Sequence, residues 1–200
     1  MKHLLKHHIH QSRFHISVLI FISALLLSAN TYAGKTLFQA HYKSNFSGLD
    51  IDIKRSLIDN ENGNFNYRLH ADSLVASINE DSKFEVESGE IKPHKYKYKR
   101  KVFGFSRKEE VVFDWPNKKA HYIRKGKPKK NATHPPAPGI LDPSLYQLKL
   151  QADLNQNKET LSYVFVRQNR LKNITFKLFK ESTFKLGKKE YPTLIYKRVN

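Results

Sequence analysis

Polar and apolar side chains alternate along many short stretches of this chain, and this period of two constrains its fold most strongly. Residues 94–103 read HKYKYKRKVF. Neighbouring side chains in an extended strand point to opposite faces, so the four lysines at 95–101 would share one face and Tyr96 and Tyr98 the other. Aromatic residues favour strands because they cover a half-buried pleated surface. We interpret this stretch as a strand with a lysine-coated outer face and an aromatic inner face.

The same period recurs along the chain. It occurs at residues 36–42, 49–53, 64–71, 75–78, 83–91, 110–115, 120–124, 161–166, 173–179 and 193–196. Turn-forming residues separate many of these stretches, for example Asn60–Gly63, Ser88–Gly89 and Pro116–Asn117. Many short strands with regular turn signals predict a mainly β fold. The expected architecture is a strongly curved antiparallel sheet, a half-barrel or open barrel, with one short helical element.

The helical element is expected directly after a proline-rich segment. Residues 127–139 contain four prolines and are expected to form a loop, because proline cannot donate to a sheet ladder. Asp142 and Pro143 then provide a helix N-cap and a first helical residue, and Leu145 and Leu148 would share one helical face. The alternation in residues 146–152 would also suit a strand, so both structures remain open for that segment.

The N-terminus predicts export. Residues 1–15 contain Lys2, Lys6 and Arg13 but no acid, and residues 16–29 contain no charge. Small residues Thr31 and Ala33 then precede Gly34. A basic start, a short apolar segment and a small-residue exit are typical of a secretory signal peptide. We therefore expect a signal peptide at 1–33, a single β-rich domain at 34–200 and a periplasmic location, without a membrane-spanning segment.

Charge and cysteine content restrict the partners. The chain has 36 Lys and Arg against 18 Asp and Glu, and loss of the three basic residues in 1–33 leaves 33 against 18. Such an excess indicates nucleic acid inside a cell, but the exported address favours a lipid, another anionic envelope component or an envelope protein partner, and no nucleic acid. A basic surface that merely faces water is the alternative. Disulfides and zinc–thiolate sites are excluded because there is no cysteine.

The order of several short motifs resembles an exported bacterial family, that of domain of unknown function 3108. The motifs are Phe38–Tyr42, Tyr67–Ala71, Ser88–Pro93, Val112–Trp115, Gly139–Leu148 and Lys185–Gly187. The resemblance implies a lipoprotein-carrier-like half-barrel, in which a curved sheet wraps a short helical element, and it implies no established activity. Family members generally continue with further strands past the position of Tyr196–Asn200. The resemblance therefore implies either a C-terminally shortened member, in which a missing strand would expose an unpaired sheet edge, or an incomplete chain.

Two functional hypotheses follow, a binding protein and a hydrolase. In the first, the inner aromatic residues line an apolar groove for an acyl chain or a partner segment, and nearby lysines favour an anionic head group. The expected ligand-binding residues are Tyr96, Tyr98, Phe113, Trp115 and Tyr146. Alternatively, these residues only form the core. The second hypothesis is a hydrolase acting on cell-wall glycan or another envelope polymer, for which Asp114 and Asp142 would have to converge.

The leading hypothesis is non-enzymatic. We expect no catalytic residues, no metal site and no cofactor, because the chain has no nucleophile elbow, phosphate-binding glycine loop or zinc-binding helix motif. Lysine–tyrosine alternation would also suit a small outer-membrane barrel. The proline-rich segment, the expected helix and the polar end at Asn200 argue against that barrel.

Overall fold

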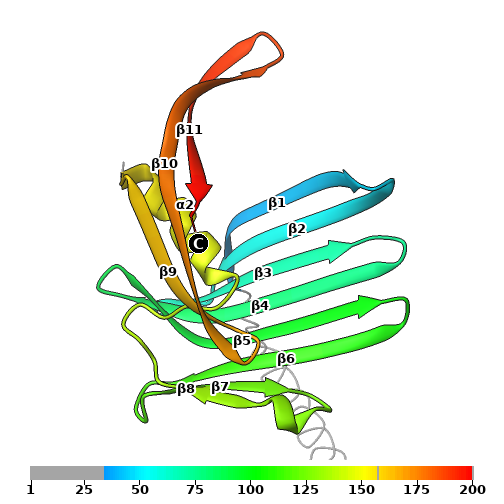
Figure 1. Ribbon diagram of the computed structural model, residues 1–200, viewed down its shortest axis with the longest axis vertical. Helices are drawn as coiled ribbons and strands as arrows, with labels where there is room; N and C mark the ends of the chain where they lie inside the picture. Colours follow the sequence, from blue (N-terminus) through cyan, green and yellow to red (C-terminus); the bar gives the residue numbers. More distant parts are fainter. Residues whose placement is uncertain (1–33, 157, 200) are drawn as a thin grey trace, which may run out of the picture. The chain divides into compact units, whose positions relative to one another are not determined.

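The computed structural model describes residues 34–156 and 158–199, whose strands form two antiparallel sheets (Figure 1). The eight-stranded sheet is a meander with its strands in chain order: β1 (Lys35–Phe46), β2 (Leu49–Asp59), β3 (Asn64–Asp72), β4 (Ala76–Glu87), β5 (Glu90–Val102), β6 (Phe105–Asp114), β7 (Lys119–Arg124) and β8 (Ala132–His134). The three-stranded sheet has the order β11-β10-β9 and consists of β9 (Thr160–Arg167), β10 (Arg170–Leu186) and β11 (Lys189–Arg198). Helix α2 (Leu145–Asp153) and the 3₁₀ turns η1 (Pro128–Lys130) and η2 (Leu154–Gln156) complete the described elements. The signal peptide expected at 1–33 lies outside the described residues.

The predicted mainly β fold with antiparallel strands and one short helix is confirmed. The strands divide between two sheets, and the connection from β8 to β9, which links them in the chain, contains α2. The expectation that 127–139 is entirely a loop is wrong at Ala132–His134, which contains no proline and pairs with β7. No helix within 34–156 or 158–199 has the length and apolar run needed to cross a bilayer.

The segment before α2 joins the two sheets. The Leu141 N–H donates to the Val164 carbonyl at 2.9 Å, and the Val166 N–H donates to the Leu141 carbonyl at 3.1 Å. Leu141 thereby forms a short parallel bridge with β9. Because Ile140 and Leu141 are almost completely buried, this bridge fixes the three-stranded sheet to the hydrophobic core.

The core lies between the sheets and consists of two adjoining clusters. One contains Tyr67, Phe84, Leu141, Leu145, Leu161, Tyr163, Phe165 and Ile174. The other contains Tyr96, Val111, Phe113, Ala120, Tyr122, Ile140 and Val166. Both clusters draw residues from the eight-stranded sheet and from β9, and the first also draws on α2, which lies against β9 (Figure 1). The core residues of β3–β7 are therefore covered by residues that follow the eight-stranded sheet in the sequence, whereas β1 and β2 contribute no buried residue.

Strand β5 confirms the predicted alternation. Tyr96 is buried at 5% exposure and Tyr98 is half-buried, whereas Lys97, Lys99 and Lys101 are exposed. Upstream, the register shifts, since Lys83 pairs with Lys95 but Phe84 pairs with Pro93. The unpaired residue between them forms a bulge, which reverses the parity of the strand. Pro93 and Tyr96 consequently both face the core although they are three residues apart.

Several hairpins of the eight-stranded sheet turn through two residues with left-handed backbone conformations. Ser47–Gly48, Ser88–Gly89 and Phe103–Gly104 have φ values of 52° and 81°, 52° and 82°, and 45° and 82°. This is the type I′ pattern, which favours Asn, Asp or Gly at the first position. A bulky residue such as Phe103 is strained there, and Phe103 is also 73% exposed, so it gains little from packing.

We expect the substitution Phe103→Asn to stabilise the fold by about 1 kcal/mol, because asparagine adopts the left-handed conformation more readily. Denaturant unfolding of the two proteins would measure the change in the free energy of unfolding. Phe105→Asn is the matched control, since Phe105 is 84% exposed and has no positive φ. An equal change for both substitutions would contradict the strain at Phe103.

Candidate functional site

A hollow lies between β4–β6, the first turn of α2 and the end of β9. This aromatic pocket has a volume of about 290 Å³. Three of the five residues expected to bind a ligand line it: Tyr96, Tyr98 and Tyr146. Tyr146 stacks on Phe165 with ring centroids 4.6 Å apart, so one wall is a rigid aromatic surface.

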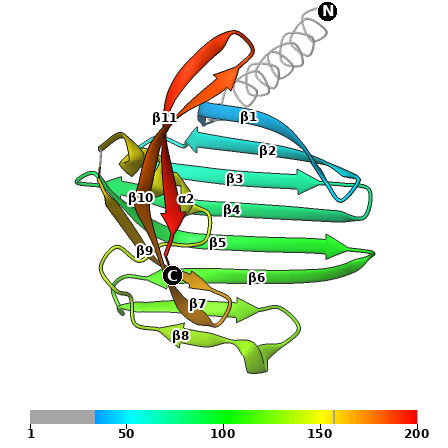
Figure 2. The ribbon, with the colours of Figure 1, turned by 45° about the horizontal axis from the view of Figure 1, so that its top comes forward.

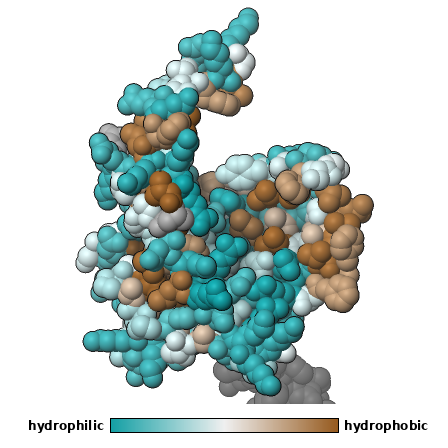
Figure 3. Space-filling model, viewed as in Figure 1, coloured by the Kyte–Doolittle hydropathy of each residue, from teal (hydrophilic) through white to brown (hydrophobic). Residues whose placement is uncertain are grey.

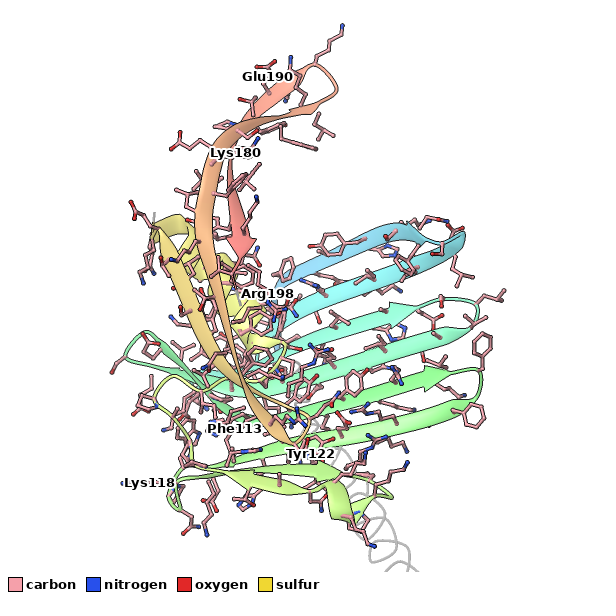
Figure 4. All side chains as sticks on the ribbon, in the orientation of Figure 1. Phe113, Lys118, Tyr122, Lys180, Glu190 and Arg198 are labelled. Atoms are coloured by element: carbon pink, nitrogen blue, oxygen red, sulfur yellow. The ribbon has the colours of Figure 1, made fainter. Side chains whose placement is uncertain are left out.

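The other two expected residues, Phe113 and Trp115, do not line this pocket. They stack on each other with ring centroids 6.3 Å apart, and the Trp115 Nε1–H donates to the Pro93 carbonyl at 2.8 Å. Phe113 (labelled in Figure 4) belongs to the core cluster with Ala120 and Tyr122. Strand parity alone cannot separate the strand aromatics that border open space from those that are covered, because packing by residues that follow β8 decides this.

A second hollow, the basic pocket, adjoins the aromatic pocket and has a volume of about 680 Å³. The two pockets share Arg107, Tyr122, Arg167 and Gln168 as lining residues, and Tyr122 is labelled in Figure 4. The basic side chains that line the second pocket are Arg107, Arg124, Lys129, Lys130, Arg167, Arg170 and Lys172. No carboxylate lines the basic pocket in the described part of the chain, so it presents a concentrated positive field.

Part of this charge is neutralised at the boundary between the pockets. Glu109 is buried, accepts a hydrogen bond from the Arg107 guanidinium and lies 3.7 Å from Arg124. Burial, and to a smaller extent a hydrogen bond with Glu109, raises the pKa of Tyr122 to about 12. Tyr122 therefore stays neutral at physiological pH. By contrast, Arg100 and Arg167 lie within 4 Å of no carboxylate in residues 34–156 and 158–199, so neither forms an ion pair there, although Glu80 and Glu109 line the same pocket.

The register of β5 and β6 concentrates positive charge at this point. Arg100 lies directly opposite Arg107 in the antiparallel pair, and like charges in that position are unfavourable. Glu109 offsets the charge of Arg107, whereas Arg100 has no carboxylate within 4 Å in residues 34–156 and 158–199. Both arginines line the aromatic pocket.

The floor of the aromatic pocket rests on a buried polar network. Glu80 accepts a hydrogen bond from the Ser144 hydroxyl. Asp142 Oδ1 accepts hydrogen bonds from the N–H groups of Ser144 and Leu145, both at 2.9 Å, and from the Ser82 hydroxyl at 3.0 Å. Helix α2 begins at Leu145 with Ser144 as its N-cap residue, so the expected N-cap Asp142 and the expected first helical residue Pro143 lie two residues too early. The Ser144 side chain makes no cap hydrogen bond, and the Asp142 carboxyl group instead accepts hydrogen bonds from the N–H groups of Ser144 and Leu145 at the start of the helix.

Asp142 is completely buried, and its Oδ2 contacts no hydrogen-bond partner within the described residues. Burial raises the pKa of this carboxyl to about 7, against the opposing effect of its hydrogen bonds. Asp114 lies at the β6–β7 turn, where hydrogen bonds from Asn117 lower the pKa of its carboxyl. Neither aspartate lines the aromatic or the basic pocket, so they do not form the pair that a hydrolase at these pockets would need.

The histidines of the eight-stranded sheet contact separate partners. His41 Nε2 lies 2.6 Å from Asp52 Oδ1, and His70 Nδ1 lies 2.8 Å from Asn79 Oδ1. No group of three or more His, Cys, Asp or Glu side chains that could hold a metal ion occurs in the portion of the chain that the structure describes.

Comparison with known proteins agrees with the motif order. The family described as "Protein of unknown function (DUF3108)" matches residues 38–200. The chain belongs to the DUF3108 family. A crystal structure described as a beta-barrel-like protein of domain of unknown function DUF1849, from Brucella abortus, is similar to this DUF3108 domain, with 10% identity and a TM-score of 0.45. The similarity covers 81% of this chain and 79% of that chain. No curated protein matches this DUF3108 domain. The description of the family states no activity.

The arginines of the two pockets were not found from the sequence. Arg100 and Arg107 belong to β5 and β6, whereas Arg167 and Arg170 flank the β9–β10 turn. Basic residues are so abundant in the sequence that nothing singles these arginines out. The register that places Arg100 opposite Arg107 is visible only in the folded sheet.

Proposed function

We propose that this DUF3108 domain is a periplasmic, non-enzymatic binding protein for an anionic amphiphilic molecule of the cell envelope. The anionic group would occupy the basic pocket, and the adjoining apolar part would lie against Tyr98, Tyr146 and Phe165. The single observation that carries the proposal is the continuity of an aromatic hollow with a basic hollow that contains no lining carboxylate.

Arginine and aromatic side chains suit this division of the ligand. Arginine donates paired hydrogen bonds that match phosphate and carboxylate groups, and Arg100 and Arg167, which form no ion pair within residues 34–156 and 158–199, are available for such bonds. Aromatic rings supply a large apolar surface at a small cost in conformational entropy. An anion shared by Arg100 and Arg107 would also relieve the repulsion between these directly opposed guanidinium groups.

Binding without catalysis accounts for the acids of the site. Glu109 is engaged by Arg107 and Arg124, and Glu80 is engaged by Ser144. Since Asp114 and Asp142 do not converge on either pocket, the hydrolase alternative has no pair of carboxylates to act as acid and base. The periplasmic location follows from the basic, apolar and small-residue succession of 1–33.

The first test is ligand binding by the exported protein, measured by isothermal titration calorimetry. Short-chain dihexanoyl phosphatidic acid is the amphiphilic anionic probe, dihexanoyl phosphatidylcholine is the zwitterionic probe and inorganic phosphate is the probe of the anionic group alone. We expect the order phosphatidic acid, then phosphate, then phosphatidylcholine. The substitution Arg167→Ala should weaken phosphatidic acid binding about 10- to 100-fold, because it removes charge-assisted hydrogen bonds.

Lys188→Ala is the control, because Lys188 is exposed in the β10–β11 turn and lines neither pocket. It removes one positive charge, as Arg167→Ala does, and should leave affinity unchanged. An equal loss of affinity in the two variants would show that only the net charge of the protein matters. That result would contradict a binding site in the pockets. Equal affinity for all three probes would contradict the proposed ligand class.

A further inference from the structure

The β1–β2, β3–β4 and β5–β6 hairpins turn at the same end of the eight-stranded sheet (Figure 2). Large apolar side chains are exposed at the tips of these three hairpins. They are Phe46 at the β1–β2 turn, Leu74 at the β3–β4 turn, and Phe103 and Phe105 at the β5–β6 turn. Their exposed fractions are 71%, 93%, 73% and 84%. Hydrophobic surface gathers at this end in Figure 3. We call these four side chains the apolar tips.

The apolar tips form a row that the sheet holds in place. The Phe103 N–H donates to the Val75 carbonyl at 2.9 Å, so the β5–β6 turn is joined to the β3–β4 turn. Because neighbouring strands lie about 4.8 Å apart, successive hairpin tips are spaced by about 10 Å. The row is therefore a set of separate apolar projections on a rigid sheet. The surface that binds them needs no continuous groove.

The apolar tips contribute little to the folded state. Phe103 occupies a left-handed position that asparagine or glycine would adopt with less strain, yet most of its surface is in contact with water. Exposed apolar clusters of this kind mark surfaces that bind a partner or a membrane. Phe105 follows two residues later with an even larger exposed fraction.

Lysines accompany the tips at the same end of the sheet. Lys99 and Lys101 precede the β5–β6 turn, and Lys108 follows it. The β7–β8 connection adds Lys125 and Lys127, and the Lys125 N–H donates to the Lys108 carbonyl at 3.1 Å. All five lysines are exposed, and none lies within 4 Å of a carboxylate in the described ranges 34–156 and 158–199. Asp50 and Asp72 lie toward the β1–β3 side, so positive charge dominates beside Phe103 and Phe105.

We propose that this end of the eight-stranded sheet docks on an anionic lipid bilayer, with the apolar tips inserted at the interface and the adjacent lysines against the head groups. Separate apolar projections suit a bilayer, which accepts each one independently, better than a protein partner, which would need a matching row of pockets. Apolar side chains flanked by lysine are the usual means of reversible attachment to anionic lipid surfaces. This surface lies outside the aromatic pocket, and its role does not depend on the ligand proposed for that pocket.

The test uses protein purified after export of the full chain, with its N-terminus established by mass spectrometry. Co-sedimentation is measured with vesicles of phosphatidylethanolamine and phosphatidylglycerol and with vesicles of phosphatidylcholine alone. We expect binding to the anionic vesicles, weakening with added salt, and little binding to the neutral ones. Phe103→Asn combined with Phe105→Ser should lower the partition onto anionic vesicles about tenfold or more.

Three further variants distinguish membrane docking from unfolding and from non-specific hydrophobic binding. Phe103→Asn alone relieves strain, so a fall in its vesicle binding cannot be a folding defect. Phe184→Ser is the matched control, because Phe184 is 58% exposed on the β10–β11 hairpin and should not affect docking. Lys101→Glu combined with Lys127→Glu changes no residue of the aromatic or basic pocket and should also weaken binding to anionic vesicles.

A spectroscopic measurement locates the contact directly. Phe105→Trp introduces a fluorophore at the most exposed phenylalanine of the tips, and unsubstituted protein corrects for the only native tryptophan, Trp115. We expect a blue shift with anionic vesicles and quenching by brominated lipid. Vesicle binding that is absent, or that persists unchanged in the tip variants, would overturn the proposal. Concentration-dependent self-association that the tip variants abolish without any vesicle binding would assign the surface to a second copy instead.

Discussion

The free energy of unfolding of the Asp142→Ala variant should be about 3 kcal/mol lower than that of the Asp142→Asn variant. The Asp142 Oδ1 acceptor holds three donors in the buried floor of the site: the N–H groups of Ser144 and Leu145 and the hydroxyl of Ser82. Asparagine retains an oxygen in that position, whereas alanine leaves these donors without it. A lost helix cap costs about 1 kcal/mol, and each unsatisfied buried donor adds a cost of about 1–3 kcal/mol.

The two variants form a matched pair because neither residue 142 titrates, so their difference measures the hydrogen bonds alone. Urea unfolding, followed by tryptophan fluorescence and by circular dichroism, gives the two free energies. The difference should be the same at pH 5 and at pH 8. Equal stabilities would mean that the first turn of α2 does not depend on this cap.

The second large effect is a pH dependence specific to Asp142. Burial raises the pKa of its carboxyl in the folded protein to about 7, above the ordinary value of 3.8. Between these values the folded protein holds a proton that the unfolded chain releases, so the stabilising contribution is complete below about pH 4 and is lost as pH rises through 7. A difference of about three pKa units corresponds to a loss of the order of 4 kcal/mol.

Denaturant unfolding of the wild-type protein and Asp142→Asn between pH 4 and pH 8 measures this loss. The free energy of the wild-type protein relative to the variant should fall across that range. Asp52 and Asp114, whose carboxyl pKa values are lowered by hydrogen bonds, give the opposite slope at acid pH, but this slope is common to both proteins and cancels. Parallel curves would show that Asp142 is ionised in the folded state throughout.

The local features of the fold could be predicted from the sequence, because they depend on residues that are close together in the chain. Alternation placed Tyr96 inside and Lys97 outside, and the Asp142–Pro143 pair marked the start of the helix region. The division into two sheets could not be predicted. Nor could the attachment of the three-stranded sheet through the bridge between Leu141 and β9, a contact between segments that alternation does not connect.

The candidate site was recovered only in part for the same reason. Tyr96, Tyr98 and Tyr146 reach the pocket, but Phe113 and Trp115 are covered, and strand parity cannot distinguish an inner residue at an opening from one under a neighbouring layer. The bulge between Lys95 and Pro93 also changes parity without a marker in the sequence. The arginines come from strands and a turn that only the fold brings together.

The order in which the core is assembled has a consequence for biogenesis. The eight-stranded meander ends at residue 134, whereas Leu141, Leu145 and β9, which cover its core residues, come later in the chain. A polypeptide delivered N-terminus first thus holds Tyr67, Phe84 and their aromatic neighbours in water until these last segments arrive. During that interval, the exposed apolar surface of the incomplete chain makes it prone to aggregation.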